Sequence, residues 1–499
     1  MTVEHVDVLI IGAGLSGVGA AHHLQTRLPG TSFAILEARQ AIGGTWDLFR
    51  YPGVRSDSDM QTLGYRFRPW SADEALADGP AILDYVRETA ADAGIEAHVR
   101  FGHRVVSARW STADARWTVV VTNDDGDSVE LTCKFLYGCG GYFRYDEGYT
   151  PHLEGVERFA GPVVHPQHWP EDLDYAGKRV VVIGSGATAV TLVPAMAGAA
   201  AHVTMLQRSP SYVIWAPSKD PIANGLRRLL GDRASYPIVR WKNVALATAL
   251  FQLSQRRPRV VKALIRAAVK HQLPAGYDVD THFKPSYNPW DQRMCLVPDG
   301  DLFKAISRGD ASVVTDRIDT FTETGVRLAS GRELDADVVV TATGLNMLAF
   351  GGIALSVDGR DIHLHDTLAY KGLMLSGVPN FAFTVGYTNA SWTLKADLVA
   401  QFVCRLLRHM QDNGYDQCVP VDDDPTMVRR PLLDFAAGYV QRSIDAFPQS
   451  GSRAPWRLAQ NYARDVVTLR HGKLEDGAMR FSRRPVVPAA AASSPALAA

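Results

Sequence analysis

The chain has 499 residues, which corresponds to about three domains of ordinary size. Hydrophobic residues make up 46% and charged residues 21%, so a large core can form, and disordered, collagen-like and small disulfide-rich proteins are excluded. The 52 Lys and Arg are balanced by 53 Asp and Glu, and this near-neutral charge does not indicate a nucleic-acid partner.

The beginning of the chain carries Glu4 and Asp7 where a signal peptide would carry Lys or Arg, so no targeting segment is expected there. Five cysteines fit a reducing compartment, and we expect a cytoplasmic protein. Residues 180–207 lack Asp, Glu, Lys and Arg, but glycine and proline interrupt them. Two buried parallel strands around a helix of small residues fit this stretch better than a membrane span. We expect no metal site, because His and Cys show no ligand spacing.

The first predicted nucleotide-binding unit starts with an apolar strand over 6–11. Gly12, Gly14 and Gly17 follow in the spacing GxGxxG and open a helix that runs to about residue 28. After a second strand, Glu37 stands 20 residues beyond Gly17, the spacing expected of a carboxylate that binds a ribose hydroxyl. The N-terminus of the helix offers free N–H groups and a positive dipole end to a pyrophosphate.

The pattern recurs after a strand over 179–183, with a second strand over 203–206. The turn between them reads GxGxxA and contains Gly184, Ser185, Gly186, Ala187 and Thr188. The position equivalent to Glu37 is Ser209, and its neighbour is Arg208. A carboxylate would repel a 2′-phosphate, whereas Arg and Ser bind one, so we expect NADPH at this second site. An ordinary surface arginine at a strand end is the alternative for Arg208.

Each unit also carries a predicted β-meander, over 99–140 and 312–344. Two such units indicate an α/β flavoprotein with two Rossmann-like dinucleotide-binding domains, FAD in the first and NADPH in the second, with β-meander insertions and a helical insertion. We expect an FAD-binding domain from 1–145 and 380–483, an NADPH-binding domain from 146–216 and 296–379, a helical insertion over 217–295 and a disordered tail over 484–499.

The helical insertion is strongly basic. Residues 227–270 hold eleven Lys and Arg but one acid, Asp232, and leucines are interleaved with the cations. One interpretation is a basic amphipathic surface for anionic lipid, or a lid over an apolar substrate. The other is an ordinary helical subdomain with a solvated basic face that roofs the active site.

A family resemblance appears directly before the second nucleotide-binding strand. The pattern FxGxxxHxxxWP is formed there by Phe159, Gly161, His165, Trp169 and Pro170. It resembles the fingerprint of Baeyer–Villiger monooxygenases, whereas the related N- and S-oxygenating flavin monooxygenases usually end it in an aromatic other than Trp-Pro. The segments YPGVRSD (51–57), YNPWDQR (287–293) and VGYTNASW (385–392) resemble the ethionamide-activating subgroup, and the resemblance covers about residues 7–472.

The resemblance implies a reaction. NADPH would reduce FAD, the reduced flavin and O2 would form a C4a-peroxyflavin, and this species would convert a hydrophobic ketone to an ester or lactone and oxygenate thioethers. Arg293 would be the catalytic arginine and Asp57 the carboxylate that holds it beside the flavin, because a peroxide anion needs a fixed cation in a dry site. An ordinary salt-bridged arginine and a turn aspartate are the alternatives, and Asp59 competes with Asp57.

The resemblance also implies that Gly44, Thr45 and Trp46 contact the flavin and that Asn389 and Trp392 line the flavin and substrate pocket. Core packing of Trp46 and helix capping by Ser391 are the alternatives. His165 and Trp169 are interpreted as a hinge between the two domains.

The expected partners are a small ketone or thioether and O2, without nucleic acid, and the basic insertion adds an expected peripheral contact with a membrane. A flavin-dependent N- or S-oxygenating monooxygenase is the alternative function. A disulfide reductase of the same architecture would need a CxxC pair, which the sequence lacks.

Overall fold

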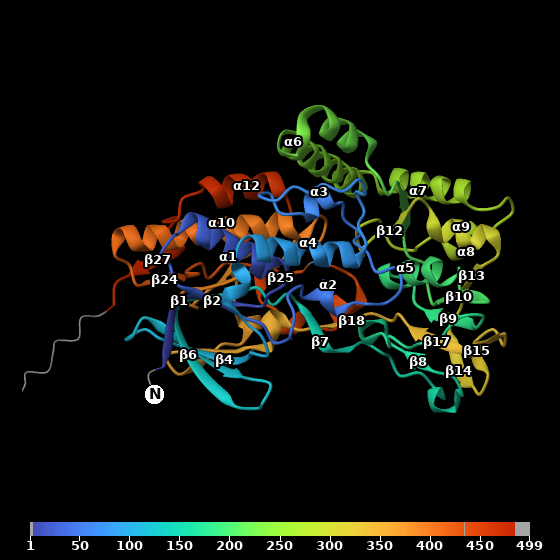
Figure 1. The fold of residues 1–499 in the computed structure, drawn as a ribbon, viewed down its shortest axis with the longest axis horizontal. Coiled ribbons are helices and arrows are strands. Elements are labelled where there is room, and N and C mark those ends of the chain that lie inside the picture. The colour runs from blue at the N-terminus through green and yellow to red at the C-terminus, as the bar shows by residue number, and fades with distance from the viewer. Residues whose placement is uncertain (1–2, 434, 485–499) are drawn as a thin grey trace, which may run out of the picture.

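The computed structural model contains two Rossmann-like sheets side by side, with a helical insertion whose α6 stands above the helices of the first domain and whose α7 lies by the second (Figure 1). It describes residues 3–433 and 435–484, so the predicted tail lies outside the described residues except for Arg484. In this described part of the chain, no helix is both long and apolar enough to cross a membrane.

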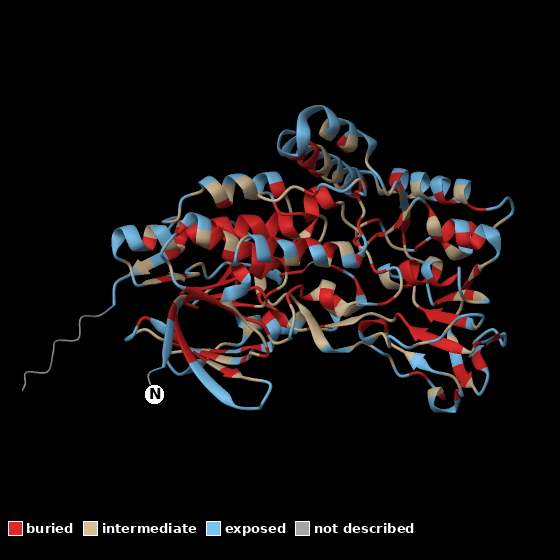
Figure 2. Cartoon of the chain, viewed as in Figure 1, coloured by how far each residue is buried: buried red, intermediate tan, exposed pale blue. Residues whose placement is uncertain are grey.

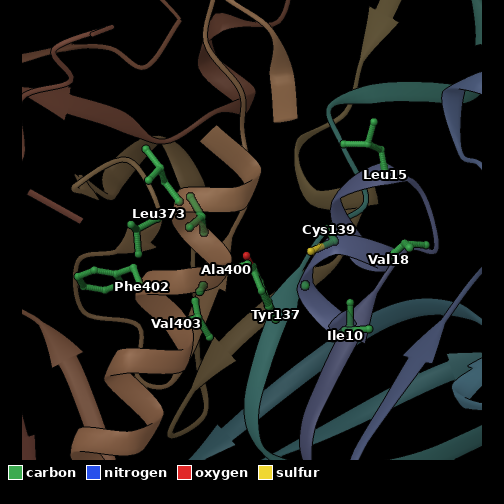
Figure 3. Close-up of a cluster of buried hydrophobic side chains, with 14 of the residues drawn as sticks. Ile10, Leu15, Val18, Tyr137, Cys139, Leu373, Ala400, Phe402 and Val403 are labelled. Carbon is green, nitrogen blue, oxygen red and sulfur yellow. The ribbon is translucent and has the colours of Figure 1, made fainter. Parts of the chain in front are cut away.

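The first domain is built on an 11-stranded sheet. Its parallel part holds β1 (Glu4–Ile11), β2 (Phe33–Leu36), β3 (Val99–Arg100), β6 (Ser128–Gly138) and β23 (Phe381–Phe383). The predicted meander is β4 (Arg104–Ser111), β5 (Arg116–Thr122) and β6, paired antiparallel. Figure 3 shows the core beside this sheet, where side chains of β1, β6 and α1 (Leu15–Arg27) lie beside those of α10 (Trp392–Asn413). This packing fixes the glycine turn between β1 and α1.

The second domain is built on a five-stranded sheet whose strands are all parallel. In spatial order these are β13 (Ala311–Thr315), β10 (His202–Gln207), β9 (Arg179–Ile183), β17 (Val338–Thr341) and β8 (Val163–Val164). The helices α5 (Ala187–Met196) and α9 (Asp301–Arg308) pack on it, and its meander is β14 (Ile318–Thr322), β15 (Gly325–Leu328) and β16 (Glu333–Asp335). The uncharged stretch 180–207 therefore forms two buried strands around a helix, as expected.

The two domains are joined by an antiparallel ribbon of β7 (Phe143–Gly148) and β18 (Leu345–Met347). After β18 the chain rejoins the first sheet at once, through β19 (Ala354–Val357), β20 (Arg360–Asp361), β21 (Ala369–Tyr370) and β22 (Met374–Leu375). Residues 354–379 were expected in the NADPH-binding domain, and this boundary is wrong. The reason is that strands of two to four residues show no hydrophobic periodicity that would assign them to one sheet or the other.

The insertion starts and ends at a parallel strand pair, β11 (Val213–Ala216) with β12 (Cys295–Pro298), close to its expected bounds of 217 and 295. It contains α6 (Pro221–Arg256), α7 (Pro258–Gln272) and α8 (Val279–His282). Gly231, with φ 73°, breaks α6 into two parts. The second part packs on α3 (Met60–Leu63) of the first domain.

The remaining elements of the described chain lie outside the insertion. They are α2 (Thr45–Leu48), α4 (Gly79–Asp92), α11 (Gly438–Gln441), α12 (Tyr462–His471), β24 (Gln417–Pro420), β25 (Arg429–Pro431), β26 (Gln449–Gly451) and β27 (Met479–Ser482), and short 3₁₀ turns over 95–98, 156–158, 166–168, 349–352, 364–366 and 444–446.

Candidate active site

A cavity of about 1310 Å³ is lined by residues of both domains and contains both glycine turns. Most of the predicted cofactor residues line it: Gly12, Gly14, Glu37, Gly44, Thr45, Trp46, Asp57, Gly184, Ser185, Gly186, Ala187, Thr188, Arg208, Ser209 and Trp392. Arg293 lines it as well. Segments that are far apart in the sequence therefore meet at one site.

The first glycine turn leaves room for a ligand at the N-terminus of α1. No side chain caps this helix, so its first N–H groups remain available. Gly17 does not line the cavity, but a Cβ there would lie 1.9 Å from the carbonyl oxygen of Gly12, so only glycine lets helix and strand approach this closely. The Glu37 carboxylate accepts N–H groups of Ala13 (2.7 Å) and Arg39 (2.9 Å), and burial raises its pKa. These residues fit the diphosphate and ribose of a dinucleotide.

The second glycine turn repeats this arrangement at α5, which also lacks a side-chain cap. The Ser185 hydroxyl donates to the carbonyl of Ser209 (3.1 Å), which fixes the turn against the next strand. Arg208 and Ser209 are exposed at the cavity. Among the described residues Arg208 has no carboxylate partner within ion-pair distance, so its guanidinium is available to a phosphate.

Arg293 and Asp57 form a two-point ion pair inside the cavity. Nε of Arg293 lies 2.9 Å from Oδ2 of Asp57, and Nη2 lies 3.3 Å from Oδ1. Asp57 raises the pKa of Arg293, so the guanidinium is permanently charged. Its side chain is 41% exposed, which leaves much of it facing the cavity. The competing Asp59 instead caps α3, where it accepts the N–H of Thr62 (3.0 Å).

Two tyrosines that the sequence reasoning missed flank Arg293. Tyr142 follows β6, Tyr439 lies in α11, and both line the same cavities as Arg293. Burial raises the pKa of Tyr142 to about 12, so it stays protonated. A smaller cavity on this side of the site is lined by Tyr142, Arg293, Met347, Tyr387, Thr388, Leu433, Phe435, Tyr439 and Val440. The signal that could have found Tyr142 is its place after Gly140 and Gly141, at the end of a parallel strand.

The segment before α10 is only partly as expected. Trp392 donates its indole N–H to Ser16 (2.7 Å), and its ring lies 5.1 Å from that of Tyr142. Asn389, which was expected in the pocket, is not among the residues that line either cavity. Its amide turns away and donates to the carbonyl of Gln460 (3.0 Å). Ser391 does not cap α10 with its side chain, because the hydroxyl pairs with Thr62 (2.6 Å).

The fingerprint segment lies outside the cavity lining and clamps the ribbon between the domains. His165 bonds through Nε2 to the carbonyl of Gly344 (3.1 Å) and accepts the N–H of Gln167 at Nδ1 (3.2 Å). The Gln167 amide in turn donates to the carbonyls of Arg144 (2.9 Å) and Tyr145 (3.0 Å) in β7.

The other fingerprint residues anchor this segment to the second domain. Phe159 is buried beside its meander, and a Cβ at Gly161 would lie 2.4 Å from the carbonyl oxygen of Asp337. Trp169 packs edge-on against Tyr175 and is followed by Pro170, whose carbonyl accepts the N–H of Leu173. None of these side chains lines the cavity, and the hinge role stays a prediction.

Residues 75–357 match the model of the flavin-binding monooxygenase-like family, and residues 10–72 match the NAD(P)-binding Rossmann-like domain. The chain therefore belongs to the flavin-binding monooxygenase-like family. It is 58% identical to the FAD-containing monooxygenase EthA of Mycobacterium tuberculosis over 97% of this chain and 99% of that one. It is 50% identical to the putative FAD-containing monooxygenase MymA of the same species over 96% and 98%.

Solved structures show the same fold. Oxidized steroid monooxygenase bound to NADP has a TM-score of 0.75 at 21% identity and covers 96% of this chain and 100% of that one. Cyclohexanone monooxygenase from Rhodococcus sp. Phi1 bound to NADP+ has a TM-score of 0.75 at 19% identity, with coverages of 97% and 100%. The expected fold and the expected class, a flavoprotein monooxygenase, are confirmed.

Proposed function

We propose that this chain is a Baeyer–Villiger monooxygenase that uses FAD, NADPH and O2 to convert hydrophobic ketones to esters or lactones, and that it also oxygenates thioethers. One observation carries the proposal. The Arg293–Asp57 pair stands in the cavity that contains both dinucleotide turns, so a fixed cation is available beside bound cofactors. The names of the relatives, FAD-containing monooxygenases, support the flavin, and the NADP in the related solved structures supports the second cofactor.

Each of the two glycine turns is proposed to bind one cofactor, FAD at the first and NADPH at the second. The uncapped N-termini of α1 and α5 bind the two diphosphates, Glu37 binds the ribose of FAD, and Arg208 with Ser209 binds the 2′-phosphate of NADPH. Bound FAD supplies the hydride acceptor for NADPH and the centre that activates O2.

Arg293 is proposed to stabilise the negative charge that develops on oxygen during the reaction. When oxygen attacks a ketone carbonyl, negative charge builds up on oxygen, and a preorganised guanidinium stabilises that charge strongly away from bulk water. Asp57 fixes Nε and Nη2, so the guanidinium does not have to reorganise during the reaction. Tyr142 and Tyr439 line the smaller cavity together with Arg293.

The substrate class follows from the lining of the main cavity. Leu348, Phe350 and Trp392 are among its apolar lining residues, and Arg293 lines it as well. An apolar ketone or thioether fits this combination, because apolar residues bind the hydrocarbon and the guanidinium binds the reacting group. A cytoplasmic location, with the helical insertion in peripheral contact with a membrane, is also proposed, and the five buried cysteines without disulfides are consistent with a reducing compartment.

The proposal is tested with purified FAD-loaded protein, NADPH, air and a linear methyl ketone, with products identified by mass spectrometry. Wild-type protein should form the ester. Arg293→Ala should still bind FAD and oxidise NADPH, while ester formation falls about 10²–10³-fold. A variant that makes ester at the wild-type rate would overturn the role of Arg293, and a wild-type protein that gives only hydrogen peroxide from ketones would overturn the assignment.

A further inference from the structure

Two arginines follow neighbouring strands of the second sheet. Figure 1 shows β10 and β13 next to each other, and Figure 2 shows that buried residues line much of this sheet. Arg208 follows β10 directly, and Arg317 stands two residues beyond the end of β13. Both arginines line the main cavity. Arg208 is proposed to bind the 2′-phosphate of NADPH, so Arg317 is a second cation at the same edge of the sheet.

The register of the two strands brings these arginines together. Gln207 at the end of β10 is the Cα partner of Thr315 at the end of β13. The next N–H, that of Asp316, donates to the carbonyl of Gln207 (3.0 Å), so the two strands end at the same level. Because paired strands lie about 4.8 Å apart, the chain leaves the sheet at Arg208 and at Arg317 as two neighbouring segments.

The acidic side chains near Arg317 are engaged with other groups. Oδ1 of Asp316 accepts the backbone N–H of Arg317 (2.7 Å), and Oδ2 accepts that of Ser330 (3.4 Å). Asp319 pairs with Arg327 (3.0 Å). In the part of the chain that the structure describes, the Arg317 guanidinium has no carboxylate within ion-pair distance. Its positive charge is therefore available to a ligand in the cavity.

The backbone of Arg317 is fixed although its side chain is exposed. Its N–H donates to Asp316, and its carbonyl accepts the N–H of Ala329 (2.9 Å) in the turn between β15 and β16. Only the side chain has to be ordered when a ligand binds, which lowers the entropic cost of the contact.

The order of the strands matches the order of groups in NADPH. The sheet runs β13, β10, β9 at this end, and the glycine turn that leads into α5 follows β9. A coenzyme with its diphosphate at the N-terminus of α5 therefore extends its adenosine half across the end of β10 toward β13. Its ribose lies at Arg208 in this arrangement, and the space beyond it is lined by Arg317.

We propose that Arg317 is the second cation that binds the 2′-phosphate of NADPH, together with Arg208. A phosphate monoester carries a charge of about −1.5 to −2 near pH 7, so one guanidinium does not neutralise it. Two neighbouring cations repel each other unless an anion lies between them, and a neutral adenine ring would not relieve this repulsion. The proposal rests on the proposed place of the 2′-phosphate at Arg208 and not on the reaction with a ketone.

The proposal is tested by calorimetric titration of FAD-loaded protein with adenosine 2′,5′-bisphosphate and with 5′-AMP, which lacks the 2′-phosphate. Wild-type protein should bind the bisphosphate more tightly. Arg317→Ala should weaken binding of the bisphosphate about 10-fold, as expected for the loss of a hydrogen bond to a charged group, and leave binding of 5′-AMP unchanged. Arg317→Lys keeps the charge and should recover part of the affinity. Arg208→Ala combined with Arg317→Ala should bind the two nucleotides nearly equally.

The matched control is Arg332→Ala, because Arg332 is an exposed arginine of the same meander that does not line the cavity. It should bind both nucleotides like wild type. Arg317→Ala that keeps wild-type affinity for the bisphosphate overturns the proposal. Equal weakening of both nucleotides overturns it too, since Arg317 would then contact the adenosine and not the phosphate.

Flavin content and thermal unfolding show whether each variant is folded. Wild-type protein that binds the two nucleotides equally would overturn the phosphate site as a whole. Because the titration involves no turnover, this result leaves ester formation open, and a wild-type protein that forms no ester leaves the nucleotide affinities intact. Failure of the phosphate site and failure of the proposed reaction are therefore distinguishable.

Discussion

At the scale of single residues, the candidate site holds a guanidinium, that of Arg293, whose position is set by the carboxylate of Asp57. Asp57 and Asp59 stand two residues apart but do different work, because Asp57 pairs with Arg293 and Asp59 caps α3. This contrast gives a matched pair of variants.

Asp57→Ala should lower ester formation about 10–100-fold, because a positioned charged hydrogen bond contributes about 1.5–3 kcal/mol. Reduction of the flavin by NADPH should be little changed, as followed by stopped-flow absorbance. Asp59→Ala should instead lower the free energy of unfolding by about 1 kcal/mol through loss of the cap, with ester formation retained. Equal losses of ester formation in the two variants would contradict the separate roles.

The choice between NADPH and NADH also depends on single residues. Arg208→Ala should raise KM for NADPH about 10–100-fold and leave KM for NADH unchanged, because only NADPH carries the 2′-phosphate. Steady-state oxidation of both coenzymes measures this, with Arg332→Ala as a control from an exposed arginine of the same domain. Equal changes of KM for NADPH and NADH would show that Arg208 does not bind the 2′-phosphate.

Local spacing predicts some of these residues and not others. The glycine turns and Glu37 follow from the sequence because their contacts lie within one strand–helix–strand unit. Arg293 and Asp57 are 236 residues apart, so only the family resemblance paired them before the structure did. Tyr439 was missed because α11 has four residues and no motif, and its place depends on the tertiary fold.

At the scale of elements, each glycine turn depends on how closely its helix approaches its strand. Gly17→Ala should abolish FAD binding or destabilise the first domain, since the added methyl would meet the carbonyl of Gly12 at 1.9 Å. Gly198→Ala, where nothing lies within 4 Å, is the control and should retain FAD. Flavin content after purification and thermal unfolding measure both, and full flavin content in Gly17→Ala would contradict the packing argument.

Long elements were predictable and short ones were not. The parallel strands of both sheets and the helices after the glycine turns follow from buried apolar runs and turn chemistry. Strands β19 to β22 have two to four residues each, and their pairing with the first sheet depends on contacts with β4 and β6 that no local pattern encodes.

At the scale of the whole molecule, His165 holds the ribbon that joins the two domains. Burial lowers the pKa of His165 below its ordinary 6.5, so the neutral ring, with Nδ1 as acceptor, is the native form. Its contribution to stability is complete above the ordinary pKa and is lost as pH falls below 6.5.

Wild-type protein should therefore lose more stability than His165→Asn when the pH falls below 6.5, because an asparagine amide bonds to its neighbours without titrating. Thermal unfolding of both proteins across this range measures the difference. Identical pH dependence would show that the clamp does not depend on the neutral histidine.

The proposed reaction inserts one oxygen atom of O2 into a ketone. FAD-loaded protein, NADPH, a linear methyl ketone and isotopically heavy O2 test it in one reaction, read by mass spectrometry. We expect an ester that carries one heavy oxygen atom. Oxidation of NADPH with heavy hydrogen peroxide and no ester, while a methyl thioether is converted to its sulfoxide, would contradict it and indicate a heteroatom oxygenase instead.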